Sequence, residues 1–212
     1  MGMIVVTANL YNGRARPESI MALLERLRPD LLAVQELSPN QAAGIEALLP
    51  HGLLDPRDDH LGLGIASSTP IEVERLSMTY RDVWVGRHPR VEVINVHVTS
   101  PLRRPIGESL RFRRRQLAEL NDHLETRPAG PRLLVGDLNS TPWWPFYRSL
   151  RRLMEDGVAA VGPAARTWGP FPWAPAFLRI DHVFAQHVEV IRAATHRLAG
   201  GDHRAVEVEV AC

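Results

Sequence analysis

The chain has 212 residues, of which 45% are hydrophobic, and this length is sufficient to bury a sizeable core in a single domain over residues 1–212. Its formal net charge of +1 excludes attraction of the whole molecule to nucleic acid or to an anionic membrane, so any anion site has to be local. All 25 basic residues are arginine, which excludes mechanisms that need a lysine base, a lysine Schiff base or a P-loop lysine.

Cysteine content and apolar runs bear on the location of the protein. The single cysteine, Cys212, is the last residue, so an intrachain disulfide is excluded and a reducing compartment fits. No run approaches the roughly eighteen apolar residues that a membrane span requires, and no basic leader precedes the first apolar run. We therefore expect a cytoplasmic monomer with no membrane segment in this chain.

Runs rich in valine, isoleucine and leucine predict a chain with many strands. The predicted strands are residues 3–8, 31–35, 62–67, 71–76, 83–86, 91–98, 132–136, 180–185, 188–195 and 205–210. Apolar residues at helical spacing predict helices over residues 17–27, 41–49, 110–124 and 145–154. Residues 162–175, which are rich in glycine, proline and tryptophan, are predicted to form a structured loop.

The order of these elements indicates the architecture. Between residues 61 and 98 the predicted strands follow one another without a helix, which favours antiparallel pairing. Helices lie between strands on either side of this section. The simplest arrangement that satisfies both patterns is an α/β fold with two stacked mixed β-sheets flanked by helices on each outer face.

A carboxylate and a carboxamide stand two residues apart just after the predicted strand at 132–136. These are Asp137 and Asn139 in the sequence Gly-Asp-Leu-Asn-Ser-Thr-Pro. Residues at i and i+2 of an extended segment project to the same side, so both can face one reacting atom. Their position at a strand end indicates a site at the edge of a sheet.

Other polar residues also follow or precede predicted strands. They are Asn9, Glu36, His97, Asp181 and the pair Asp202-His203. Acidic, amide and imidazole groups that converge at strand ends are what a metal-assisted hydrolase of phosphate esters requires. Each residue alone has an ordinary explanation, such as a turn or a solvated strand end, and the combination favours a site.

Six short motifs carry a resemblance to the endonuclease/exonuclease/phosphatase superfamily, which includes deoxyribonuclease I. In chain order they are Thr7-Ala8-Asn9-Leu10, Val34-Gln35-Glu36, Asn95-Val96-His97, Gly136-Asp137-Leu138-Asn139, Arg179-Ile180-Asp181-His182 and Gly201-Asp202-His203-Arg204-Ala205-Val206. They extend over nearly the whole chain. The resemblance implies a four-layer α/β sandwich and a Mg²⁺-dependent phosphoesterase that attacks with water.

The candidate metal ligands are oxygen donors. Mg²⁺ prefers hard oxygen ligands and keeps several waters, so one or two carboxylates and an amide oxygen suffice. Glu36 is the best candidate, with Asn9 and Asp202 contributing. Mn²⁺ is the alternative ion.

The remaining strand-end residues are assigned to proton transfer and charge stabilisation. Asp137 is similar to the water-activating residue of the family, and Asn139 would orient the water or donate to a phosphoryl oxygen. A carboxylate such as Asp181 keeps the imidazole of His203 protonated, so His203 suits stabilisation of the phosphoryl charge. His97 matches the histidine branch of the family. The other histidines, His182 among them, are interpreted as surface or structural residues.

Two groups of residues bear on the substrate. An arginine cluster would bind phosphates, or its members on the helix at 110–124 would form the solvated face of that helix. The cluster comprises Arg103, Arg104, Arg111, Arg113, Arg114 and Arg115. The aromatic stretches around Trp143 and Trp168 would pack in the core or would form an apolar wall for a base, a deoxyribose or a lipid tail.

These observations leave three functions open. We prefer a phosphoesterase that acts on a small or lipid-linked phosphate, because the chain is short for the family and leaves little room for loops that grip duplex DNA. It also resembles bacterial family members that act on lipid-linked phosphates. The alternatives are a DNA endonuclease or exonuclease, with nucleic acid as its partner, and an inactive binding module of the same fold.

Overall fold

The computed structural model describes residues 2–102, 105–162 and 165–211, and their strands form two six-stranded sheets. The first sheet has the order β11 (Glu189–Arg197), β12 (Arg204–Ala211), β1 (Met3–Asn9), β2 (Leu31–Gln35), β4 (Leu63–Ser67) and β3 (His51–Asp55). The second has the order β5 (Glu72–Leu76), β6 (Val83–Arg87), β7 (Glu92–His97), β8 (Arg132–Asp137), β10 (Asp181–Gln186) and β9 (Glu155–Asp156). Each sheet is mixed, with one parallel pair, β1·β2 or β7·β8, among antiparallel neighbours.

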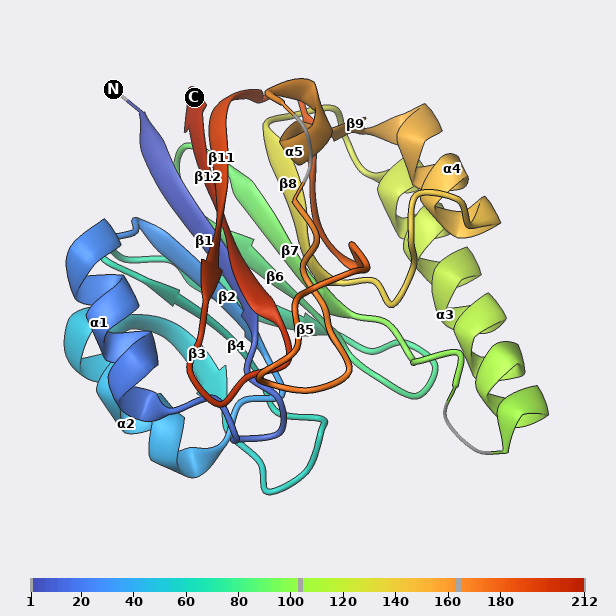
Figure 1. Ribbon diagram of the computed structural model, residues 1–212. Helices are drawn as coiled ribbons and strands as arrows, with labels where there is room; N and C mark the ends of the chain where they lie inside the picture. Colours follow the sequence, from blue (N-terminus) through green and yellow to red (C-terminus); the bar gives the residue numbers. More distant parts are fainter. Residues whose placement is uncertain (1, 103–104, 163–164, 212) are drawn as a thin grey trace.

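Helices cover both outer faces of the stacked sheets (Figure 1). Helices α1 (Pro17–Leu27) and α2 (Pro39–Leu48) cover the first sheet, and α3 (Ile106–Thr126) and α4 (Pro145–Leu153) cover the second. The short α5 (Gly157–Ala160) precedes the long segment to β10. This is the predicted four-layer sandwich. Among the helices that the structure describes, none has the length and apolar character needed to cross a bilayer.

The sequence of each layer explains its position. Helix α1 begins with Pro17 and buries Ile20, Leu23 and Leu24 on the face that packs against the first sheet. Strands β1, β2 and β8 are buried almost along their full length, because each lies between a helix layer and the opposite sheet. Valine and leucine residues of both sheets form the core between them. The resulting core fixes the sheets relative to each other.

A buried polar contact also joins the two sheets close to the strand ends. Gln35 of β2 donates to Asn95 Oδ1 of β7 at 2.7 Å and to Thr7 Oγ1 at 3.1 Å. Asn95 donates in turn to the backbone carbonyls of Val34 and Gly64. Buried side chains that are paired across a core in this way restrict the relative position of the sheets.

The predicted elements are present, with three additions and one extension. The unpredicted elements are β3, β9 and α5, and helix α3 begins at Ile106 instead of residue 110. Strand β3 contains Gly52 with a φ of 118° and lies exposed at a sheet edge, so it lacks the alternating apolar pattern of a buried strand. The antiparallel pairing expected for residues 61–98 is present in β5·β6 and β6·β7.

Candidate active site

Strand register in the second sheet brings three of the predicted residues together. Asp137, the last residue of β8, pairs in parallel register with His97, the last residue of β7. On its other side Asp137 pairs with Asp181, the first residue of the antiparallel strand β10. Residues that are opposite each other in neighbouring strands have Cα atoms about 5 Å apart, so the pairing alone places these side chains at one edge.

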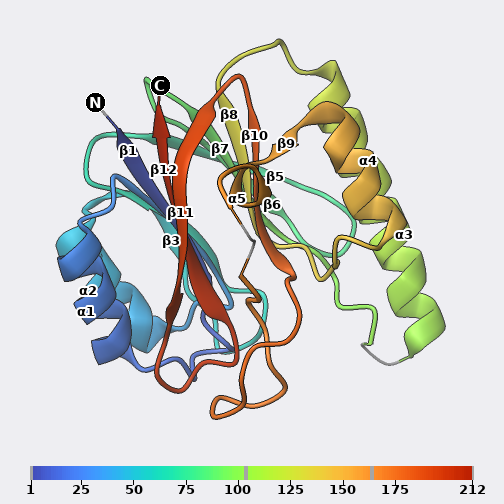
Figure 2. The same cartoon turned by 45° about the horizontal axis from the view of Figure 1, so that its top comes forward.

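The first sheet supplies the other predicted residues at the same end of the sandwich, opposite the two chain termini (Figures 1 and 2). Asn9 ends β1, and Glu36 directly follows β2, which runs parallel to β1. Asp202 and His203 precede β12, which is antiparallel to β1. The two sheets therefore present their polar strand ends to one another across the core.

The carboxylate of Asp137 is held by hydrogen bonds to both oxygens. Oδ1 accepts the backbone N–H of Asn139 at 2.7 Å, and Oδ2 accepts the side-chain amides of Asn139 at 3.0 Å and Asn9 at 3.1 Å. Asn139 has a φ of 46°, a left-handed conformation that asparagine tolerates. Burial raises the pKa of Asp137 to about 7, and the charge of Asp181 acts in the same direction, while His203 opposes it.

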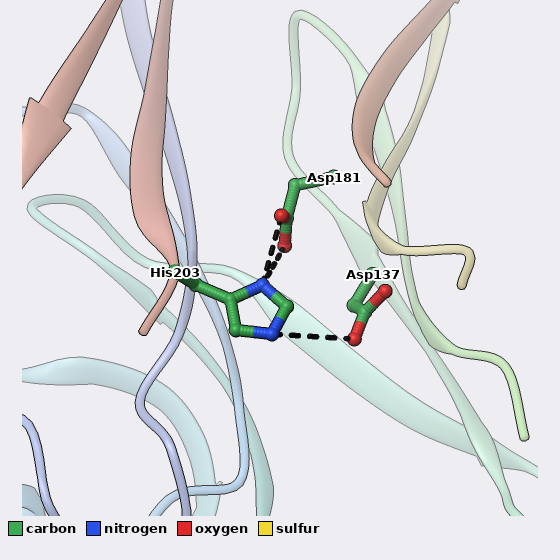
Figure 3. Close-up of side chains that lie close together, drawn as sticks. All are labelled: Asp137, Asp181 and His203. Carbon is green, nitrogen blue, oxygen red and sulfur yellow. Dashed lines mark hydrogen bonds and ion pairs between the residues drawn. The ribbon is translucent and has the colours of Figure 1, made fainter. Parts of the chain in front are cut away.

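His203 lies between the two aspartates (Figure 3). Its Nδ1 is 2.9 Å from Asp181 Oδ2, and its Nε2 is 4.0 Å from Asp137 Oδ2. Burial alone would lower the pKa of His203, but the Asp181 carboxylate overcomes that effect, and together with Asp137 and Asp202 it raises the pKa to about 10. The imidazole is therefore a cation at neutral pH, and its Nε2–H is available at the Asp137 side.

The backbone around Asp181 is fixed by a threonine from the segment after α5. Thr167 Oγ1 accepts the N–H groups of Ile180 and Asp181, each at 3.1 Å. The same segment forms single β-bridges from Trp168 to Leu178 and from Trp168 to His203. The predicted structured loop thus links β10 to the start of β12.

His97 differs from His203 in its charge. Its Nε2 lies 3.6 Å from both Glu36 Oε1 and Asp137 Oδ2, and its side chain is 4% exposed. Burial lowers the pKa of His97 well below its ordinary value, and the cations Arg81 and His203 lower it further. The two histidines of the site are therefore in opposite protonation states at neutral pH, one neutral and one charged.

Glu36 and Asp202 provide carboxylate oxygens that suit a hard divalent cation. Asp202 Oδ2 accepts the indole N–H of Trp168 at 3.1 Å, and Oδ1 is buried with no hydrogen-bond partner among the described residues. Burial raises the pKa of Asp202, and the nearby charge of Glu36 contributes to that rise. Asp202 Oδ1 lies 4.0 Å from His203 Nε2, and a divalent cation would relieve the repulsion between the two carboxylates and coordinate this oxygen, so the donor set fits a hard divalent cation.

Asn9 is oriented differently from the metal ligand that the sequence predicts. Its Oδ1 accepts the backbone N–H of Tyr11 at 2.9 Å, while its Nδ2 donates to Glu36 at 3.3 Å and to Asp137. The amide nitrogen, and not the oxygen, therefore faces the carboxylates. In this arrangement Asn9 holds two acidic side chains in position.

Asp137, Asp181 and His203 offer potential ligand atoms that lie within 4.8 Å of one another. The tight contact between His203 Nδ1 and Asp181 is that of an ion pair, because the imidazole is protonated. A protonated imidazole donates at both nitrogens and has no lone pair for a metal. The protonated His203 is therefore no metal ligand in this cluster, and the carboxylates of Glu36 and Asp202 are the other oxygen donors of the site.

A cavity of about 1150 Å³ opens over these residues. Asp137, His97 and His203 form part of its wall. Large apolar side chains form much of the remainder, namely Leu102, Trp143, Trp144, Trp168 and Phe177. Trp143 is 79% exposed and Leu102 is 76% exposed, so the mouth of the cavity is an apolar surface in contact with water.

The predicted substrate-binding residues have different positions. Trp143 and Trp168 line the cavity, as expected for an apolar wall. Arg111 is an exposed residue of α3 that pairs with Glu108 at 3.8 Å, and it does not line the cavity. Arg103 and Arg104 lie outside the described residues.

Another arginine of the predicted cluster is part of the protein interior. Arg113 is 3% exposed and donates to the carbonyl oxygens of Thr99 and Leu138 and to Ser140 Oγ. It therefore holds the segments that follow β7 and β8. His182 is also buried, and its Nε2 lies 2.7 Å from the carbonyl oxygen of Ser140, in agreement with a structural role.

Arg81 is a cavity residue that the sequence motifs do not identify. It lies two residues before β6, is 8% exposed, and lines the cavity together with His97. Burial lowers its pKa to about 10, and the charges of Glu36 and Asp137 oppose that effect, so Arg81 is still a cation at neutral pH. In the sequence, only its position just before the strand β6, which pairs with the His97 strand β7, could have indicated Arg81, and such a position is a weak signal.

Comparisons with known proteins agree with this architecture. A model of the "Endonuclease/Exonuclease/phosphatase family" matches residues 6–203. No curated protein matches the sequence.

Several solved structures are similar. The 3′-5′ exonuclease NExo of Neisseria meningitidis has a TM-score of 0.78 at 20% identity, over 97% of this chain and 98% of that chain. A NExo structure from Neisseria, described as a 3′ phosphatase bound to product DNA hairpin, has a TM-score of 0.79 at 19% identity, over 99% and 100%. Humanized TDP2 of D. rerio has a TM-score of 0.76 at 16% identity, over 100% and 99%. At these identities the likenesses establish the fold alone.

Proposed function

The chain belongs to the endonuclease/exonuclease/phosphatase family, and from this premise we propose that it is a metal-dependent hydrolase of phosphate mono- or diesters that uses water as the nucleophile. Family members are hydrolases that act on phosphoester bonds. The observation that carries the proposal is the buried carboxylate of Asp137, fixed by three amide hydrogen bonds and placed beside a cationic histidine. These are a base and an electrostatic stabiliser held in one geometry.

The proposed mechanism assigns a separate task to each group. Asp137 accepts the proton that water loses as it approaches phosphorus, and the amides of Asn9 and Asn139 hold the carboxylate in place. His203, kept protonated by Asp181, donates from Nε2 to a phosphoryl oxygen as negative charge develops there. Glu36 and Asp202 would hold Mg²⁺ or Mn²⁺, which when bound neutralises charge on the phosphoryl group.

His97 is suited to a further proton contact. As a neutral imidazole with Nε2 beside both Glu36 and Asp137, it can donate one hydrogen bond without adding a second cation to the site. That contact orients the carboxylates toward the substrate. Protonation of the leaving oxygen by His97 is the alternative assignment.

We further propose that the substrate is a small or lipid-linked phosphate. The apolar wall of the cavity supports this, because Trp143, Leu102 and Phe177 present large exposed surfaces that an apolar substituent would cover. Arg111 lies outside the cavity and Arg113 is buried in the protein interior, so these two arginines of the cluster do not form a row of phosphate-binding side chains along the cavity.

That the chain acts as a monomer in the cytoplasm also remains a prediction.

A nuclease is the second candidate function. NExo, similar in fold, is described as a 3′-5′ exonuclease and as a 3′ phosphatase bound to a DNA product. The same aromatic wall could stack a base at a strand end. An inactive binding module is disfavoured, because the proton-handling groups and the carboxylates that fit a metal are all present.

A substrate panel tests the proposal. The purified chain is given a phosphomonoester, a lipid-linked phosphate in detergent micelles, single-stranded DNA and nicked duplex DNA, each with Mg²⁺, with Mn²⁺ and with EDTA. We expect metal-dependent release of phosphate or alcohol, fastest from the esters with an apolar substituent. Efficient cleavage of DNA at low enzyme concentration would favour the nuclease, and hydrolysis of nothing in the panel would contradict the enzyme proposal.

A further inference from the structure

Arg81 has buried hydrogen-bond donors without acceptors. Nε and Nη1 of its guanidinium are both buried, and neither has a hydrogen-bond partner in the part of the chain that the structure describes. The same part of the chain places no carboxylate oxygen within ion-pair distance of this side chain, although the charges of Glu36 and Asp137 act on it. Buried charged groups in native proteins are nearly always paired, so an unpaired one in a cavity calls for a ligand.

The residues before Arg81 hold it in place. Thr79 donates its backbone N–H to Glu119 of α3 at 2.6 Å, and its hydroxyl donates to the same carboxylate. Tyr80 has a φ of 73°, its ring stacks on Phe112 of α3 at a centroid distance of 5.3 Å, and its hydroxyl lies 3.1 Å from His60 Nε2. A left-handed tyrosine is strained, and contacts with α3 and His60 maintain it. These contacts hold the backbone that leads into Arg81, and the guanidinium carbon of Arg81 lies 5.8 Å from the centroid of the Tyr80 ring.

The surroundings of Arg81 indicate what the ligand is. Arg81 and His97 line both the large cavity and a smaller one of about 160 Å³, so the guanidinium stands between two hollows beside Asp137. A guanidinium can donate to two oxygens of a single tetrahedral oxyanion. A site rich in carboxylates needs such a positive donor, because the carboxylates repel an incoming anion. Other amide donors near Asp137 are already committed, since Asn139 Nδ2 donates to Val98 O and to Asp137.

We propose that Arg81 is a phosphate-binding residue of the site, and that its free donors bind non-reacting oxygens of the phosphoryl group of the substrate and of the product phosphate. This inference rests on the proposed function and extends it, because the ligand class is a tetrahedral phosphoryl oxyanion. Arg81 thereby offsets the repulsion that Glu36 and Asp137 exert on an incoming anion. Two other arginines, Arg166 and Arg179, also line the cavity, but the charges of Glu36 and Asp137 act directly on Arg81.

Phosphate binding by two variants tests the proposal. Inorganic phosphate is the probe, and its affinity is measured by ³¹P NMR titration for the wild type, Arg81→Gln, Arg81→Lys and the matched control Arg87→Gln, with and without Mg²⁺. Arg87 pairs with Glu74 on the edge of the second sheet, away from the cavity. We expect phosphate to bind about tenfold or more weakly to Arg81→Gln, with partial recovery in Arg81→Lys and no change in Arg87→Gln.

Two further readouts separate this role from a structural one. Arg81→Gln removes a buried cation beside acidic side chains, so Mn²⁺ should bind with unchanged or higher affinity, as measured by electron paramagnetic resonance. The melting temperature of this variant should not fall. Unchanged phosphate affinity in Arg81→Gln would overturn the proposal. So would equal losses of Mn²⁺ affinity and thermal stability, which would make Arg81 a structural counterion. Because phosphate binding is measured without turnover, an enzyme that hydrolyses no ester would contradict the proposed function and leave the Arg81 result interpretable.

Discussion

Asp137 and Trp143 lie six residues apart on the same segment, yet their environments are opposite. Asp137 is 2% exposed and accepts hydrogen bonds on both carboxylate oxygens, whereas Trp143 is 79% exposed at the mouth of the cavity. The first belongs to a polar centre of strand-end residues, comprising Asp137, Asn139, Asp181, His97 and His203. The second belongs to an apolar rim on loops, comprising Leu102, Trp143 and Phe177.

This difference suggests that the polar centre carries out the reaction and that the apolar rim selects the substrate. Pairing between β7, β8 and β10 places His97, Asp137 and Asp181, and the ion pair with Asp181 holds His203, so the geometry of the polar centre is built without a ligand. The apolar rim is exposed and lies on connecting segments, which tolerate sequence change better than strands. We therefore expect substitutions in the polar centre to lower kcat and substitutions in the rim to alter KM according to the substrate.

The largest effect in this comparison is expected for Asp181→Asn. Among the carboxylates around His203, Asp181 raises its pKa most, so without the Asp181 charge burial lowers that pKa and a larger fraction of His203 is neutral at neutral pH. We expect kcat to fall about 100-fold at pH 7 and the alkaline limb of the pH–rate profile to move to lower pH. The matched control is Asp122→Asn on the exposed side of α3. An unchanged pH profile with a lower kcat would contradict the role of the ion pair.

The next prediction concerns stability of the metal-free protein. The pKa of Asp137 is about 7 in the folded protein against an ordinary value of 3.8, so between these values the folded state retains a proton that the unfolded chain has lost. The contribution of Asp137 to the free energy of unfolding therefore falls as pH rises from about 4 to 7. Relative to the wild type, Asp137→Asn should gain roughly 2–4 kcal/mol over that range.

Urea unfolding at several pH values measures this difference, and saturating Mg²⁺ provides the contrast. A bound divalent cation favours the ionised carboxylate, so the wild type should lose the pH dependence when Mg²⁺ is present. If the difference in the free energy of unfolding between Asp137→Asn and the wild type does not change with pH, the pKa of Asp137 is at its ordinary value in the folded protein, and the prediction is wrong.

Trp168 lines the cavity and donates to Asp202, one of the two carboxylates proposed to bind the metal, so its replacement tests the link between the aromatic wall and that site. Trp168→Phe removes the hydrogen bond to Asp202 Oδ2 and keeps most of the ring. Partners that orient a metal ligand typically contribute tenfold or more to metal affinity, so we expect about tenfold weaker Mn²⁺ binding. Trp173→Phe is the control, because Trp173 is 75% exposed and does not line the cavity. Equal effects of the two substitutions would contradict this link.

The smallest effect is expected at the rim itself. Trp143→Ala removes a large apolar surface that an apolar substituent would cover, so KM for an ester with a long alkyl chain should rise several-fold. The KM for a short-chain ester should change less, and Trp173→Ala serves as the control. Steady-state kinetics with the two esters measures the ratio. A loss of kcat on both esters would place Trp143 in the polar centre instead.

The polar centre could be predicted from the sequence because strand ends are readable positions. Asp137, His97 and Asp181 stand at the boundaries of clear apolar runs, and neighbouring strands bring such boundaries together. The fold was readable for the same reason, since buried strands and amphipathic helices have distinct apolar patterns and clear boundaries in the sequence.

Side-chain direction and loop geometry could not be predicted in this way. The amide orientation of Asn9 depends on the N–H of Tyr11, and the burial of Arg113 depends on carbonyl oxygens exposed by two separate strands. Arg81 is placed by contacts of Thr79 and Tyr80 with a helix some forty residues later in the chain. Each is a tertiary contact with no local sequence pattern, so a cluster of arginines was a poor guide to the cavity.

The central claim, that Asp137 is the base of a metal-dependent phosphoesterase, is tested most directly by hydrolysis of bis(p-nitrophenyl) phosphate with wild type and Asp137→Asn across a Mg²⁺ titration. We predict nitrophenol release by the wild type that rises with Mg²⁺ and stops with EDTA, and a rate about 1000-fold lower in a folded Asp137→Asn variant. Equal rates for the two proteins, or hydrolysis that does not depend on metal, would contradict the account.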